Sequence, residues 1–393
     1  MINQTEQMSY RLSTLNTQQQ KISYQMSTKN LLQQGSDDSM LYSRVISVDD
    51  KIRTYEGLQT QIERTNIQNN AADTSMNEIK KILETIKKEL IKANTSTTSN
   101  EGLAAIAANI SGLKENLYQL SNTQVEGEYV FAGSDSSVKP FEKDSNGKVT
   151  YVGDNQLRKV AVEEGSYRDR GITGFDMMMY PSSTAYKGQT LTFKETDRIV
   201  DQDGNEWRFI DQDNLDADNN IKTGVETNKL YKFDLDGNLT TDAPINVNFD
   251  STTNTYTTTP AFTADGTKFE AKTNIFNLMD DTLNALKKVD SVGNPISDSL
   301  SKTLISNSQA EFDKAFDGVN IAHAELGGRN QIFETSLERV SAKLTQYNIL
   351  SQQIGAADLA KVAMEAKALE LTYTALYSTI SKTNQLSLVN FLN

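Results

Sequence analysis

The sequence predicts an α+β protein: an elongated, discontinuous helical rod built from both chain ends, with a central β-rich inserted domain. Two observations predict this arrangement. Near both termini, apolar residues recur at alternating three- and four-residue steps, which is the spacing of a coiled-coil seam. In the middle of the chain, the hydrophobic period changes to two and turn formers become frequent, as in short strands. Because the insert separates the two helical halves, those halves must pack together from distant parts of the sequence.

The terminal segments carry the clearest signal, and we expect assembly helices at 1–40 and at 356–393. Each apolar stripe is narrow and flanked by Gln, Ser, Thr and Asn, so neither helix buries enough surface to be stable alone. We therefore predict that the two helices pair with each other and with neighbouring subunits. The predicted interface residues are Met8, Leu12, Leu15, Ile22, Met26, Leu359, Val362, Leu369, Tyr373, Leu376 and Ile380.

Residues 41–133 are expected to form the N-terminal half of the rod. The first helix is expected to stop at Gln33-Gln34-Gly35, with the glycine in the left-handed conformation that follows a helix. Ser36, Asp37 and Asp38 offer N-cap oxygens and carboxylates for the next helix. That helix has no proline, and a short polar break near 95–100 predicts an antiparallel partner after it.

Residues 134–273 are expected to form the β-rich insert, with a core of its own, because they combine aromatic and β-branched residues with most of the prolines. Helical spacing returns in 274–355, the expected C-terminal half of the rod. Gly327-Gly328 interrupts this spacing, and two interpretations stay open: a kink, or a close approach between helices. The expected strands lie at 148–152, 190–193, 206–210, 229–235, 245–249 and 255–259.

Composition excludes several classes of function. The net charge of −13 argues against nucleic acid, which requires a basic surface. The chain has no cysteine and a single histidine, His323, so zinc–thiolate and multi-histidine metal sites are excluded. We expect no catalytic residues, no metal and no cofactor, and hence no enzyme. No apolar run is long enough to span a membrane, and the first residues do not read as a cleaved signal peptide.

Two aspartate-rich stretches, 201–205 and 234–238, resemble fragments of a calcium loop. Both lack the ligand set and the glutamate of that motif, and both lie between strand-like segments, so hairpin turns are favoured. Asp211, Asp213, Asp216 and Asp218 form a denser acidic group. We interpret it as a solvated loop, with weak cation binding as the alternative.

Four motifs resemble the flagellin family, and they lie in the helical zones at the two ends of the chain. The most specific is Gly127-Glu128-Tyr129-Val130-Phe131-Ala132-Gly133, which is similar to the G-x-Y-x-F-A-G element of the hook-associated branch of that family. The segment 33–38, Q-Q-G-S-D-D, resembles N-x-P-S-D-D-P without the prolines. The segment 324–329, A-E-L-G-G-R, resembles A-x-V-G-A-R, and 386–392, L-S-L-V-N-F-L, resembles the terminal S-L-F-N-Y-L.

The resemblance implies a structural subunit that is exported through the flagellar type III apparatus without a cleaved signal peptide. It implies an extracellular place at the hook–filament junction. The implied partners are a FlgK-type hook-associated protein, flagellin, copies of the chain itself in a ring, and a cytosolic FlgN-like export chaperone. Two alternatives stay open: a filament flagellin, or an unrelated secreted coiled-coil surface protein.

Overall fold

The computed structural model divides the chain into two compact units. Unit 1 comprises Met1–Gln61 and Ser336–Asn393, and unit 2 comprises Ile62–Thr335. We describe each unit by itself. The residues that the structure describes are 2–95, 98–186, 188–210, 229–233, 239–250, 255–259 and 268–392.

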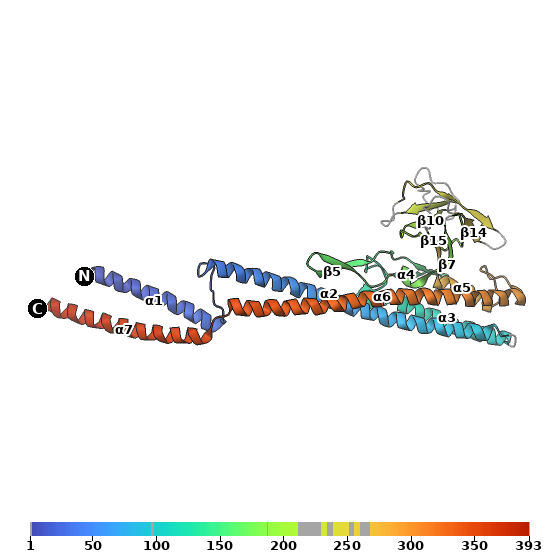
Figure 1. The fold of residues 1–393 in the computed structure, drawn as a ribbon. Helices are drawn as coiled ribbons and strands as arrows, with labels where there is room; N and C mark the ends of the chain where they lie inside the picture. Colours follow the sequence, from blue (N-terminus) through green and yellow to red (C-terminus); the bar gives the residue numbers. More distant parts are fainter. Residues whose placement is uncertain are drawn as a thin grey trace. The chain divides into compact units, whose positions relative to one another are not determined.

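Unit 1 is made only of helices. Helix α1 (Ile2–Thr28) packs against α7 (Leu359–Leu392), as Figure 1 shows. The first part of α2 (Ser39–Ala93) packs on the last part of α6 (Asp298–Gly355). Tyr55 stacks on Tyr347 with ring centroids 5.4 Å apart, and Ser351 Oγ donates to Asp49 Oδ1 at 3.2 Å. These contacts run in opposite directions along the two helices, so α2 and α6 are antiparallel in unit 1.

Unit 2 has a helical core built from α2, α3 (Asn100–Ser121), α5 (Ile275–Leu286) and α6. Fully buried side chains line this core at helical spacing. Polar contacts mark its edge: Lys87 Nζ lies 2.5 Å from Asp313, and Nε2 of His323 lies 2.8 Å from Asp73. The buried residues include Met76, Ile79, Leu83, Ile86, Leu90, Ile110, Phe312, Val319 and Leu326.

Helix α6 runs through Gly327-Gly328 without a break. Apart from the helix's own backbone, no atom of the described residues lies within 4 Å of a Cβ built on either glycine. The helix is therefore not broken at the glycines. Within this chain the close-approach interpretation is wrong, because the glycines face open space.

The β-rich insert contributes to two cores, which differs from the single core expected for 134–273. Phe141, Val149, Met177 and Met178 are buried with the helices of unit 2. Only residues from Ala185 onward share a separate core, which contains Phe193, Ile199, Trp207, Leu230 and Phe269. The physical reason is that the first hairpins of the insert lie on α3 and α5, where large side chains complete the helical core.

The separate core is covered by antiparallel sheets (Figure 1). Over the described residues, one sheet has six strands in the order β12-β11-β10-β9-β15-β7, and another has three in the order β13-β14-β8. The strands are β7 (Met179–Tyr186), β8 (Leu191–Phe193), β9 (Arg198–Asp201), β10 (Glu206–Ile210), β11 (Lys229–Phe233), β12 (Ile245–Asn246), β13 (Asn248–Asp250), β14 (Thr255–Thr258) and β15 (Lys268–Asn274).

Smaller elements join this insert to the helices. They are β1 (Gln124–Val125), β2 (Glu128–Tyr129), β3 (Phe141–Lys143), β4 (Val149–Tyr151), β5 (Arg158–Glu163), β6 (Ser166–Arg170) and α4 (Gly174–Met178). Each of the pairs β1–β2, β3–β4 and β5–β6 is an antiparallel two-stranded hairpin. Among the described residues, none of the helices has the length and apolar character needed to cross a membrane.

Candidate assembly surface

The segment that follows α1 and the segment that precedes α7 contact each other. We call this contact the terminal clasp (residues 29–31 and 355–357). The backbone N–H of Leu31 donates to the carbonyl of Gly355 at 2.7 Å, and that of Ala357 donates to Lys29 at 2.8 Å. The side chain of Gln25, which is buried, adds a hydrogen bond from Nε2 to the carbonyl of Leu31 at 2.7 Å. The clasp thus fixes where α1 ends and where α7 begins.

The clasp corrects the expected end of the first helix. Helix α1 ends at Thr28, and Lys29, with φ 60°, takes the left-handed conformation that was expected for Gly35. The reason is tertiary: Lys29 pairs with Ala357, which overrides the preference for glycine after a helix. Gly35 instead lies beside Tyr42: a Cβ there would be 3.2 Å from the ring, which would have to shift by a few tenths of an ångström.

Aspartate side chains cap the N-termini of α2 and α7, the two helices that follow the clasp. Asp38 Oδ1 accepts from the backbone N–H of Leu41 at 2.9 Å, as predicted. Asp358 Oδ1 accepts from Ala360 and Lys361 at 3.0 and 3.1 Å, which caps α7. Backbone hydrogen bonds from Gln33 and Gln34 lower the pKa of Asp37, so this turn is strongest when Asp37 is ionised.

The structure brings most of the predicted interface residues into the contact between α1 and α7. Val362 and Leu369 are buried there. Tyr373 donates its hydroxyl proton to Asn16 Oδ1 at 2.5 Å, across the two helices. Met26 and Leu359 are instead exposed, at 52% and 45%. The half-buried members are Met8, Leu12, Leu15, Ile22, Tyr373, Leu376 and Ile380.

Helix α7 has a second apolar face that the sequence analysis missed. Met364 and Leu371 are each 68% exposed, seven residues apart, and lie on the side of the helix opposite Val362 and Leu369. Ala360 and Ala368 are exposed on the same side. The 4-4-3 spacing of these residues was a detectable signal, but the stronger stripe through Leu369 obscured it. The pair of helices therefore still exposes apolar surface after it has formed.

The element 127–133 has a structural role in unit 2. Glu126 and Gly127 both have positive φ, 52° and 82°, as in a type I′ turn between β1 and β2. Phe131 and Ala132 are fully buried. The backbone N–H of Gly174 donates to Phe131 at 2.7 Å, where only a glycine leaves room for the ring of Tyr151.

Other candidate groups have ordinary structural partners. Arg329 Nη1 donates to the carbonyl of Gly171 at 2.9 Å, so it holds the β6 hairpin to α6. Asp201 Oδ1 accepts from the backbone N–H groups of Asp203 and Asn205 at 3.0 and 2.9 Å, as in the predicted turn. The second loop, 234–238, and the acidic group at Asp211, Asp213, Asp216 and Asp218 lie outside the described residues.

Comparison with known proteins shows what the chain resembles. Residues 2–136 match the model of the bacterial flagellin N-terminal helical region. Over 103 residues the chain is 27% identical to flagellar hook-associated protein 3 of Escherichia coli. The chain is thus similar to flagellins in its N-terminal helical region and to hook-associated protein 3. That alignment covers 26% of this chain and 32% of the curated relative, so it spans about a third of that protein's length.

The fold agrees with this assignment. The crystal structure of flagellar hook-associated protein 3 from Legionella pneumophila aligns at 16% identity with a TM-score of 0.51, over 79% of this chain and 98% of that one. At this level of identity the likeness concerns the fold, which is long terminal helices with a central β region. It confirms the α+β class that the sequence predicts.

Proposed function

We propose that the chain is a structural, non-enzymatic subunit of the bacterial flagellum at the junction between hook and filament. In this proposal it contacts a FlgK-type hook-associated protein on one side and flagellin on the other, and copies of the chain form a ring. It is exported through the flagellar type III apparatus, with a FlgN-like chaperone covering the terminal helices in the cytosol.

One observation carries the proposal: the paired terminal helices expose a second apolar face after pairing. If α7 packed only against α1, Met364 and Leu371 would stay exposed, and their apolar side chains would not contribute to stability. Neighbouring subunits supply the missing contacts in the assembly. The family match at 2–136 supports the same function, because it includes the whole of α1, α2 and α3.

Two substitutions two residues apart separate the inner face from the outer face. Leu371→Asp places a charge on the exposed face, so we expect an unchanged melting temperature of the monomer and normal export, but filaments that detach from hooks. Leu369→Asp places the charge between α1 and α7, where Leu369 is 8% exposed. That variant should lose the helix pair in the monomer, at a cost of roughly 2–4 kcal/mol.

Thr372→Asp is the matched control, because Thr372 is exposed and polar beside Leu371. It should leave filaments attached. Normal filaments in the Leu371→Asp strain would contradict the proposal. Immunogold labelling of purified hook–filament complexes then distinguishes the junction protein, labelled in one narrow band, from a filament flagellin, which labels along the whole filament.

A further inference from the structure

The methionines of the chain differ in exposure between the two units. Those of unit 2 are all buried, at 5% exposure or less, and they are Met76, Met177, Met178, Met179 and Met279. In unit 1, by contrast, Met26, Met40 and Met364 are 52%, 84% and 68% exposed. An oxidant in solution acts first on exposed thioethers. It therefore modifies unit 1 and spares the cores of unit 2.

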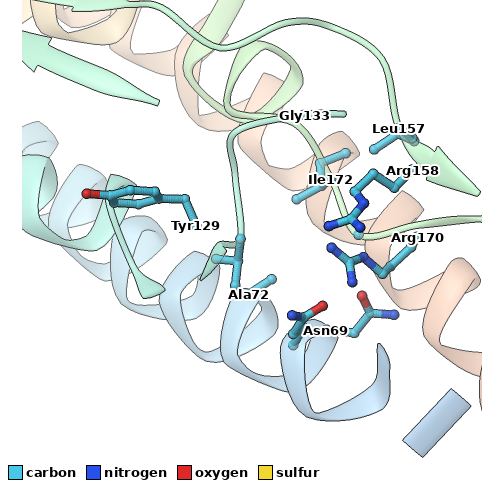
Figure 2. A pocket seen from close by; sticks show the side chains of 11 residues that line it. Asn69, Ala72, Tyr129, Gly133, Leu157, Arg158, Arg170 and Ile172 are labelled. Atoms are coloured by element: carbon cyan, nitrogen blue, oxygen red, sulfur yellow. The ribbon is translucent and has the colours of Figure 1, made fainter. Parts of the chain in front are cut away.

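A small pocket reaches α2 close to one of the buried methionines without exposing it. The pocket lies between α2 and the β5–β6 hairpin, and Ala72, one turn before Met76, lines it (Figure 2). Its other walls include Asn69, Arg158 and Arg170. The space open to the centre of a water-sized sphere is about 20 Å³, room for one such molecule. A small oxidant in this pocket meets amide and guanidinium groups, because Met76 has no exposed surface.

Met364 lies in the middle of the outer face of α7. Ala360 and Ala368, one turn to either side, are exposed. Leu371, seven residues further on, is as exposed as Met364. This is the apolar face that the proposed function assigns to neighbouring subunits. The thioether of Met364 is therefore open to solvent in the free chain and covered in the assembly.

Met40 provides the internal comparison. It lies in the first turn of α2 and is more exposed than Met364. Its neighbours on the same side of that helix, Ser43 and Arg44, are exposed and polar. Exposure alone is thus not what distinguishes Met364. The difference is that Met364 belongs to an apolar face.

We propose that Met364 is a site of reversible oxidation that controls subunit assembly, an inference that rests on the function proposed above. A peroxide transfers one oxygen atom to the sulfur: the O–O bond breaks, a sulfur–oxygen bond forms, and the peroxide is reduced to water while the thioether is oxidised to a sulfoxide. The sulfoxide oxygen is polar, so burying it in an apolar contact costs free energy.

Oxidation acts on the free chain and not on the assembled one. In the free chain, Met364 lies on the side of α7 opposite Val362 and Leu369, so the added oxygen leaves the helix pair intact. In the assembly, a neighbouring subunit keeps oxidants away from the sulfur. Methionine sulfoxide reductases restore the thioether, so the block is reversible wherever such an enzyme reaches the chain.

Peroxide footprinting tests the site directly. In the purified full chain, limited hydrogen peroxide should add one oxygen atom to Met364 and to Met40, should leave Met76 unmodified, and should not change the melting temperature. In purified hook–filament complexes, Met364 should keep its thioether. Peptide mass spectrometry measures both. Equal modification of Met364 in the free and assembled chain would overturn this inference alone. Absence of the chain from the complexes would overturn the proposed function as well.

Substitutions test the effect on assembly. Met364→Gln introduces a polar group of similar length and should cause filaments to detach, whereas Met364→Leu keeps the apolar volume without sulfur and should leave them attached. Met40→Gln is the matched control and should also leave them attached. Firmly attached filaments in the Met364→Gln strain would overturn the inference. If Leu371→Asp filaments detached in the same experiment, the proposed function would still stand.

Discussion

Gly133 lies in a backbone conformation that an L side chain rarely adopts, with φ +94°. A Cβ there would be 2.1 Å from Oδ1 of Asp154. The same Oδ1 accepts from the backbone N–H of Ser134 at 2.9 Å and from that of Gln156 at 2.9 Å. The carboxylate thus ties the end of the buried element 127–133 to the loop after β4, and it fills the space beside the glycine.

We predict that Gly133→Ala destabilises unit 2 by about 3 kcal/mol or more, because φ strain and a steric clash act together. Gly165→Ala is the matched control. Gly165 also has positive φ, 77°, but a Cβ there meets open space, so about 1 kcal/mol of strain is expected. Urea unfolding measures both. Equal losses would mean that the Asp154 loop adapts to the added methyl group.

Glu206 and Arg198 form a bidentate ion pair between β10 and β9, with N–O distances of 2.5 and 2.8 Å. Burial opposes ionisation of Glu206, but the hydrogen bonds and charge of Arg198, together with Arg208, outweigh it and lower its pKa. A lowered carboxyl pKa stabilises the folded state above the unfolded value, about 4.5. That stability is lost as the pH falls through the folded value.

The insert should therefore unfold on acidification below pH about 4.5 before the helical core does. Glu206→Gln leaves Arg198 without its carboxylate, and we expect a loss of about 2–4 kcal/mol at pH 7 and a weaker acid dependence. The fluorescence of Trp207, the adjacent and only tryptophan, reports on this core. An unchanged acid transition in the variant would show that another carboxyl controls it.

At the scale of elements, the helix pair α1–α7 depends on how α7 begins. Asp358→Ala removes the acceptor for two backbone N–H groups, at a typical cost of about 1 kcal/mol. Hydrogen exchange should then speed up in the first turns of α7. Glu365→Ala, an exposed change two turns later, should leave these amides unaffected. Equal protection in both variants would mean that the clasp alone sets the start of α7.

The helices were predictable because their apolar spacing is long and regular, as in α2, where Met76, Ile79, Leu83, Ile86 and Leu90 are all fully buried. The strands at 206–210 and 255–258 were found from alternation. Strand β15 was missed: Lys268, Glu270 and Lys272 alternate with buried Phe269 and Ala271, but charged residues have low β propensity. Its pairing with β7 and β9, which the sequence does not show, stabilises it.

The candidate assembly surface was only half predictable. The seam residues were found because they contact a partner inside the chain, and Leu369 and Val362 are the clearest cases. The outer face through Met364 and Leu371 was not found. In the sequence of one helix, the more apolar of two stripes is recognised first and obscures the other. The clasp was also missed, since a bridge between Asn30 and Ala356 joins residues with no local signal.

At the scale of the whole chain, the division of the insert between two cores determines what can be removed. Pro181 of β7 and Lys272 of β15 are partners in register, so their Cα atoms lie about 5 Å apart. Deleting 182–271 with a two-residue turn in their place should keep the helical core of unit 2. Hydrogen exchange in α2, α3 and α6 should stay near that of the full chain.

Deleting 134–273 is the contrasting variant. It also removes Phe141, Val149, Met177 and Met178 from the helical core, so we expect a loss of several large buried side chains at about 2–5 kcal/mol each. That variant should not fold stably. If both deletions preserved the protection of the helices, the first hairpins would be dispensable, contrary to their burial.

Because Pro181 and Lys272 are paired, a foreign domain could be inserted between them in place of 182–271. Any guest whose own ends lie a few ångströms apart could be grafted there, with β7 and β15 serving as a short two-stranded stem. The host would then carry its guest on a helical base that folds without help from the graft. Exchange of one inserted domain for another would leave the terminal helices and their contacts with partners unchanged.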